Sequence, residues 1–306
     1  MNTASLLARI PDLSPRDTTM LTDIFHRFEH VGRRFDAYAS LPPRDRLPRA
    51  ISELQTTPRS GWLRVNPELS FRDVLSTHGR TYNGPRVLIE ERAHKGCESI
   101  AEHLIECEEL YIKLFFHAPH RTLGQEVCKF HDVGEPAFAD FTPHDKISPE
   151  EKERLEQIAI NLLTEARRSG DLYALHTYNC FTIFDRLVTS FAPLQHEMLE
   201  QIAKNRANGS IRPAQERFVR ILEGIYTEPI SDTDLAALQC RTKDIDRLQM
   251  AYRAHRIWTE GLYTVPTEEA RQKLDEFWDW IATRLKTEEC KGDFTRLRTI
   301  DDRFGG

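Results

Sequence analysis

A hydrophobic repeat close to 3.6 residues recurs along most of this chain and limits its possible folds more than any other feature. Residues 98–116 show it most clearly, because Ile100, Leu104 and Cys107 fall on one helical face together with the next apolar positions. The alternation with period two that is typical of half-buried strands is scarce. The repeat therefore predicts an all-α fold.

Capping residues and helix breakers indicate where the helices begin and end. Ser148 suits an N-cap, and Pro149 suits the first helical position, so one helix should start there, run to Arg168 and be closed by Gly170. Residues 58–94 are rich in Arg, Gly, Asn and Pro and predict a loop with one short helix. The polar residues 291–306 predict a poorly ordered tail. Further helices are expected within residues 1–50 and at residues 122–131, 171–190, 194–205, 213–226, 232–260 and 267–286.

The charge balance argues against several classes of protein. The 306 residues include 42 Lys and Arg against 48 Asp and Glu, a net charge of −6, whereas nucleic-acid coats and membrane-surface proteins rely on excess positive charge. The sequence contains no run of about 18 apolar residues, so no membrane span is expected. The N-terminus lacks a secretory-signal pattern. Six cysteines without a C-x-x-C pair indicate reduced thiols. We therefore expect a cytoplasmic protein whose partner is neither a membrane nor a nucleic-acid polymer.

The side chains best suited to chemistry lie near the middle of the chain. His103 is in mid-helix on the apolar face, where an imidazole needs a hydrogen-bond partner or a ligand. His131 and Asp132 are adjacent at the end of the next expected helix, and the break at Gly134 lets both reach one ion. Imidazole and carboxylate suit divalent ions such as Zn, Mn, Co, Ni or Fe, and three ligands leave positions open for water. Glu135 lies one turn beyond His131 and is placed to act on that water.

The segments ESIAEH, HDVGE and DFTP, followed by a helix that contains EEK, resemble in order the HD-domain metal-dependent phosphohydrolases. The chain is most similar to the branch of bacterial 5′-deoxynucleotidases and their eukaryotic relatives, which carry a P-R-x-G-W motif, here residues 58–62. The resemblance implies an all-α HD-domain helical bundle at residues 47–260. The other parts would be an N-terminal helical extension, an insertion within the bundle, and a C-terminal helical extension with its tail: residues 1–46, 64–96 and 261–306.

This resemblance also implies a set of metal ligands. His103, His131 and Asp132 match the family's histidine and its paired HD ligands. The fourth ligand is expected within a K-x-x-D-x-L pattern, which makes Asp246 the candidate and Asp244 a less favoured neighbour. Together they would hold one divalent transition metal, and Mn, Co, Ni, Zn and Fe all stay open.

Catalytic and substrate-binding roles follow from the same resemblance. Glu135 and Asp140 match the acidic residues that follow the HD pair. The implied reaction is removal of phosphate from nucleoside 5′-monophosphates by attack of a metal-activated water, in a protein that we expect to be a homodimer. Four residues would bind the substrate: Arg59 at the phosphate, Trp62 against the base, and Lys146 and Lys152 as added positive charge.

Two other functions stay open at this point. Some HD proteins hold two irons and act as oxygenases with the help of further histidines, and the chain offers four candidates: His94, His117, His144 and His176. The other alternative is a metal- or nucleotide-binding module without turnover, whose partner surface would lie on terminal helices that carry Trp258, Trp278 and Trp280.

Overall fold

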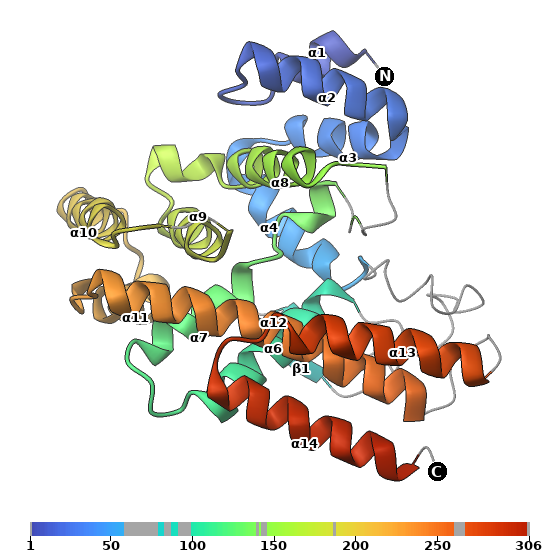
Figure 1. Cartoon of the computed structure of the whole chain (residues 1–306). Coiled ribbons are helices and arrows are strands. Elements are labelled where there is room, and N and C mark those ends of the chain that lie inside the picture. Colours follow the sequence, from blue (N-terminus) through green and yellow to red (C-terminus); the bar gives the residue numbers. More distant parts are fainter. Residues whose placement is uncertain are drawn as a thin grey trace.

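The structure is a computed structural model that describes residues 2–57, 79–82, 87–90, 99–138, 141, 146–185, 188–259 and 267–304. Helices dominate it (Figure 1). The α-helices are α1 (Thr3–Leu7), α2 (Pro15–Arg27), α3 (Glu29–Ala39), α4 (Pro43–Leu54), α6 (Ile100–Leu114), α7 (Arg121–Phe130), α8 (Pro149–Leu163), α9 (Leu172–Asp185), α10 (Ala192–Ala207), α11 (Glu216–Thr227), α12 (Asp232–Thr259), α13 (Thr267–Ala282) and α14 (Glu288–Phe304). Short 3-10 helices are η1 (Glu135–Ala137), η2 (Glu165–Ser169) and η3 (Pro213–Gln215).

The all-α fold class expected from the hydrophobic repeat is confirmed. The described residues add one short antiparallel strand pair, β1 (Gly79–Tyr82) and β2 (Val87–Glu90). The expectation of a loop with one short helix is wrong for these two strands, and the rest of residues 58–94 lies outside the described part of the chain. The dipeptide Asn83-Gly84 between them is a hairpin signal that the sequence analysis overlooked.

At one end of the molecule, α2 and α3 pack against α8 (Figure 1). The apolar part of this contact includes Phe25, Phe35 and Leu162, all of them buried. A charged pair reinforces it, because Arg154 donates to both carboxylate oxygens of Asp17 at 2.6 Å. The N-terminal helices are therefore fixed to α8.

The centre of the molecule is the packing of α6, α7 and α12 against one another (Figure 1). α6 and α7 approach each other closely where Gly124 faces the ring of Tyr111. A Cβ atom at position 124 would overlap that ring, so only glycine permits this separation. As a result, the middle of α6 and the C-terminal end of α7 come close together.

At the other end of the molecule, α13 and α14 pack on α12 (Figure 1). The expectation of a poorly ordered tail is wrong, because residues 288–304 form α14. The buried side chains of Cys290, Phe294 and Leu297 repeat at helical spacing. The polar residues between them hid this repeat when the segment was judged by its composition.

The tryptophans expected near this end have different environments. Trp278 is buried against Phe294, with ring centroids 5.1 Å apart. Trp280 is partly exposed and stacks on Phe277. The side chain of Trp258 lies outside the described part of the chain. Trp278 is thus a core residue, and it cannot contribute to a partner surface.

Two capping boxes start the helices that frame the central region. Ser99 accepts a hydrogen bond from the backbone N–H of Glu102, whose carboxylate accepts one from the backbone N–H of Ser99. Ser148 and Glu151 repeat this arrangement at the start of α8; the sequence predicted Ser148 as the N-cap but not the reciprocal bond from Glu151. None of the described helices is both long enough and apolar enough to span a membrane.

Candidate metal centre

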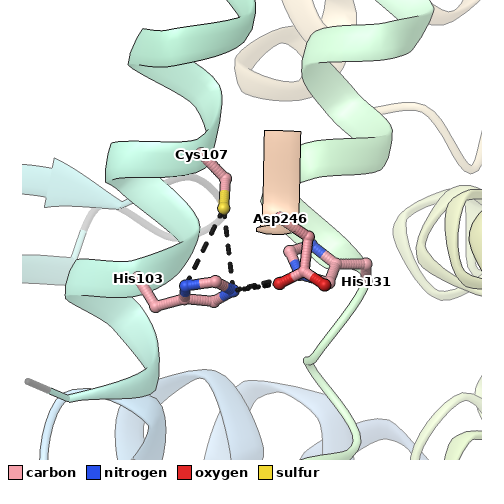
Figure 2. A group of neighbouring side chains, drawn as sticks. All are labelled: His103, Cys107, His131 and Asp246. Atoms are coloured by element: carbon pink, nitrogen blue, oxygen red, sulfur yellow. Dashed lines mark hydrogen bonds and ion pairs between the residues drawn. The ribbon is translucent and has the colours of Figure 1, made fainter. Parts of the chain in front are cut away.

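Four polar side chains from three elements converge at the centre of the molecule. His103 is on α6, His131 and Asp132 directly follow α7, and Asp246 is on α12. The Nε2 atom of His103 lies 3.2 Å from His131 Nε2 and 3.2 Å from Asp246 Oδ1. Asp132 Oδ2 lies 3.4 Å from His103 Nε2 and 3.5 Å from His131 Nε2. Figure 2 shows the two imidazoles and the Asp246 carboxylate turned toward one another.

The opposite nitrogen of each imidazole is bound to an oxygen that can only accept a hydrogen bond. His131 Nδ1 lies 2.9 Å from the carbonyl oxygen of Cys128, and His103 Nδ1 lies 2.7 Å from Gln249 Oε1. Both Nδ1 atoms therefore carry hydrogen. In the neutral imidazoles each Nε2 atom then presents a lone pair to the other.

The two Nε2 lone pairs face each other and the carboxylates of Asp132 and Asp246, and this arrangement requires a positive charge between them. The spacing fits a single divalent ion, because ligands at bond lengths of about 2.1 Å lie about 3.0–3.4 Å apart in octahedral or tetrahedral geometry. The measured separations run from 3.2 Å to 3.8 Å. The donor set of two imidazoles and two carboxylates thus fits a divalent metal.

The pKa shifts in this cluster reflect the same demand for positive charge. Burial alone would lower the pKa of His131, but the charges of Asp132 and Asp246 raise it above its ordinary value. Burial would raise the pKa of Asp246, yet His103 and His131 hold it well below its usual range. Without a metal, a protonated His131 imidazole would supply part of the missing charge.

Cys107 is a neighbour of this cluster that the sequence analysis did not consider as a ligand. Its Sγ atom lies 3.6 Å from Nε2 and 3.8 Å from Nδ1 of His103, so it sits over the face of the ring (Figure 2). A sulfur that shared an ion with Nε2 would lie at least about 4.5 Å from Nδ1, because the ion is on the opposite side of Nε2. As placed here, Cys107 packs on His103 and is out of position to share its ion.

The structure separates the two aspartates that the sequence left as alternatives. Asp244 is fully buried and turned toward the start of α14. Its Oδ2 atom accepts hydrogen bonds from the backbone N–H groups of Lys286 and Thr287, both at 2.7 Å. Asp244 therefore joins α12 to the α13–α14 connection, and Asp246 alone of the two faces the histidines.

Glu135 lies one tight turn after the HD pair. Its backbone N–H donates to the carbonyl oxygen of Asp132 at 3.1 Å, and its side chain is 6% exposed. The N-terminal helices reach the same turn, because Arg34 donates to the carbonyl oxygen of Pro136 at 2.9 Å. Three further predicted site residues, Arg59, Trp62 and Asp140, lie outside the described part of the chain.

The two lysines assigned to substrate binding differ in their surroundings. Lys146 is exposed, and its carbonyl oxygen accepts a hydrogen bond from Arg27 at 2.6 Å. Lys152 is partly buried: its Nζ atom donates to the carbonyl oxygen of Phe141 at 3.1 Å and lies 3.6 Å from Glu156. Lys152 is thus held beside the chain that follows Glu135.

Glu156 is a further acidic residue near the centre that the sequence analysis missed. Burial raises its pKa to about 7; the charge of Lys152 lowers it in part, and the charges of Asp185 and Asp132 add to the rise. The sequence offered one signal for Glu156: it follows Lys152 by four residues, which places both side chains on the same helix face.

Of the four additional histidines that a di-iron site would use, the structure describes two, and neither lies in this cluster. His176 is fully buried, with Nε2 3.1 Å from Glu126 and Nδ1 3.1 Å from the hydroxyl of Tyr226. His117 is exposed beside Phe116. The other two, His94 and His144, lie outside the described residues.

Two curated relatives of the chain are named 5′-deoxynucleotidases. The 5′-deoxynucleotidase hdd1 of Schizosaccharomyces pombe is 30% identical over 115 residues, which cover 38% of this chain and 44% of that protein. The 5′-deoxynucleotidase HDDC2 of Dictyostelium discoideum is 59% identical over 112 residues, which cover 37% of this chain and 49% of that protein. The chain is similar to 5′-deoxynucleotidases.

The resemblance to the 5′-deoxynucleotidase-like branch of HD-domain phosphohydrolases is thereby confirmed. The chain spans about half the length of the curated relatives it matches. No protein-family profile and no solved structure matches it.

Proposed function

We propose that this protein is a metal-dependent phosphomonoester hydrolase that removes phosphate from nucleoside 5′-monophosphates. One observation carries the proposal: where α6, α7 and α12 meet, the two imidazole Nε2 atoms lie 3.2 Å apart, and each lies 3.2–3.8 Å from the carboxylates of Asp132 and Asp246. Such a site holds a divalent ion and leaves positions open for water and substrate. The relatives named 5′-deoxynucleotidases support a nucleotide as substrate.

His103, His131, Asp132 and Asp246 would hold the ion. A divalent ion there would polarise a phosphate oxygen and acidify a water molecule. The identity of the metal among Mn, Co, Ni, Zn and Fe is left to experiment. The two histidine rings are already fixed by their Nδ1 hydrogen bonds, so they need no rearrangement before they bind.

Two carboxyl groups would handle the protons of the reaction. Glu135 would take a proton from the attacking water, since it is buried one turn after Asp132. The water oxygen forms a bond to phosphorus and the ester bond to the 5′ oxygen breaks. Asp140 would protonate that leaving oxygen, so that the products are a nucleoside and inorganic phosphate.

The substrate would be bound mainly by residues that precede or follow Glu135 and Asp140 in the sequence. Arg59 would contact the phosphate, because a guanidinium group matches its oxygens in pairs, and Trp62 would stack on the base. Lys146 and Lys152 would add positive charge at the edge of the site. We also propose that the protein acts as a homodimer in the cytoplasm.

The test is phosphate release from a panel of nucleotides and simple phosphomonoesters, with Mn, Co, Ni, Zn and Mg supplied in turn. We expect release from nucleoside 5′-monophosphates and its loss in His131→Ala and Asp132→Ala. A matched control is His196→Ala, since this histidine is on α10 and its side chain is 83% exposed. Full activity in either cluster variant would refute the proposal.

A further inference from the structure

The orientation of His103 depends on one buried amide. His103 Nδ1 lies 2.7 Å from the Oε1 atom of Gln249, which is on α12 one turn after Asp246. The Gln249 side chain is fully buried. The same stretch of α12 therefore provides both a candidate ligand and the partner of another candidate ligand.

Glu106 determines which end of that amide faces the histidine. The Nε2 atom of Gln249 donates to Glu106 Oε2 at 2.8 Å. Glu106 is on α6 one turn after His103, and its other oxygen lies 3.1 Å from Arg256 and 3.4 Å from Arg253. A carboxylate can only accept, so the amide nitrogen must point to Glu106 and the amide oxygen to His103.

This orientation has a direct consequence for the metal centre. Because Gln249 Oε1 only accepts, His103 must carry its hydrogen on Nδ1, and its Nε2 lone pair faces His131 and Asp246. A reversed amide would present N–H groups to Nδ1. The imidazole hydrogen would then move to Nε2, where it would occupy the position of an ion.

We propose that Gln249 is a positioning residue, which fixes the tautomer and ring orientation of His103, and that Glu106 keeps the Gln249 amide in the required orientation. The proposal deepens the proposed function and rests on its metal centre. Only His103 depends on a side chain in this way, since the partner of His131 Nδ1 is the backbone carbonyl of Cys128. Partners of this kind typically change metal affinity about 10- to 100-fold when they are removed.

The experiment compares Gln249→Leu with Gln239→Leu. Gln239 is also a buried glutamine on α12, but it donates to the backbone carbonyl of Ile183 at 3.0 Å. Co²⁺ affinity is measured by calorimetry, and ¹⁵N NMR of the metal-free protein reports the histidine tautomers. We expect Gln249→Leu to weaken Co²⁺ binding about 10- to 100-fold and to reduce the Nδ1–H tautomer of His103. Gln239→Leu should leave both unchanged.

Glu106→Gln tests the chain of hydrogen bonds from Glu106 through Gln249 to His103 without altering the shape of the core. It decides whether Gln249 positions His103 if Gln249→Leu does not fold. A glutamine at position 106 can accept or donate, so it no longer selects one orientation of Gln249. We expect a smaller loss of Co²⁺ affinity and a mixture of His103 tautomers. Unchanged affinity and tautomer in these variants, or equal losses in Gln249→Leu and Gln239→Leu, would overturn the inference.

Neither readout depends on turnover, so the two proposals can fail separately. A wild-type protein that binds Co²⁺ but releases no phosphate would contradict the proposed function, and the Gln249 comparison would still be decisive. Conversely, a Gln249→Leu variant with wild-type Co²⁺ affinity and wild-type phosphate release would refute only the positioning role.

Discussion

Two buried histidine clusters lie near Phe130, and they have opposite chemical character. In the first, His103 and His131 turn their Nε2 atoms toward each other and toward carboxylates. In the second, His176 has protein partners at both nitrogens, Glu126 at Nε2 and the Tyr226 hydroxyl at Nδ1. Phe130 is in contact with the His176 ring and directly precedes His131.

The two clusters differ in the source of the positive charge that balances their carboxylates. In the second cluster, Lys129 lies 2.7 Å from Glu126 and 3.0 Å from Glu108, so the protein supplies its own cation. In the first cluster, the carboxylates of Asp132 and Asp246 lie against the two imidazoles. A buried histidine beside an acid is therefore no indicator of a metal site; what matters is whether the protein itself completes the charge and hydrogen bonds.

The largest effect should come from breaking the second cluster. Glu126→Ala leaves the ring of His176 and the ammonium of Lys129 without their shared carboxylate, which should lower the free energy of unfolding by about 3–5 kcal/mol. Urea unfolding measures the loss. Metal affinity of the folded protein should stay unchanged, and a selective loss of metal binding would show that the two clusters are not distinct.

The first cluster should respond in the opposite way. Asp246→Asn should weaken Co²⁺ binding by at least about 100-fold, the upper end of what even outer partners contribute. Asp244→Asn should keep Co²⁺ affinity but lower the free energy of unfolding by about 1–3 kcal/mol, because the hydrogen bonds from Lys286 and Thr287 lose their charged acceptor. Calorimetric titration with Co²⁺ and urea unfolding of both variants separate these outcomes. Equal effects in the two would contradict the assignment of Asp246.

Acid should weaken the second cluster through Glu126. Burial would raise the pKa of this carboxyl, but His176 and Lys129 lower it to about 2, below its ordinary value of 4.5. A carboxyl with a lowered pKa stabilises the fold fully above its ordinary pKa, and this contribution is lost as the pH falls from about 4.5 toward 2. Urea midpoints measured from pH 6 downward should therefore fall less steeply in Glu126→Gln than in the wild type. Identical slopes would show that Glu126 is not the titrating group.

The smallest effect is expected at Cys107. Its sulfur lies over the His103 ring, so Cys107→Ala should change Co²⁺ affinity by less than about threefold, or under about 0.7 kcal/mol. The wild-type protein loaded with Co²⁺ should lack a sulfur-to-cobalt charge-transfer band in the near ultraviolet. An intense band that disappears in Cys107→Ala would instead make the thiol a ligand.

Much of the fold was predictable because its signals are local. The N-cap at Ser148 and the repeat across α6 each involve neighbouring residues, and the structure agrees with both. The helix that begins at Ser148 ends earlier than expected, because α8 stops at Leu163 and Gly170 closes the 3-10 helix η2. The errors arose where a local signal was weak or contradicted by its surroundings. Polar residues outnumber the buried positions of α14, and the two strands are only four residues long.

The candidate site was harder to complete from sequence, because its geometry depends on helix rotation. Asp244 and Asp246 share one short motif, yet residues two apart on a helix point about 160° apart around the helix axis. Their roles could be separated only once α12 was packed against α6 and α14. Cys107 and Gln249 were missed, although they follow His103 and Asp246 by four and three residues on the same helix faces.

The sequence by itself determined that the chain is helical and which residue types lie near its centre, because periodicity, caps and short motifs are properties of adjacent residues. Tertiary structure alone decided which imidazole lone pairs stay available. The partner of His103 Nδ1 is 146 residues away, and the carboxylate bound to His176 is 50 residues away. Only the packing of distant helices settles whether a buried histidine is fully satisfied by the protein or is left to bind an ion.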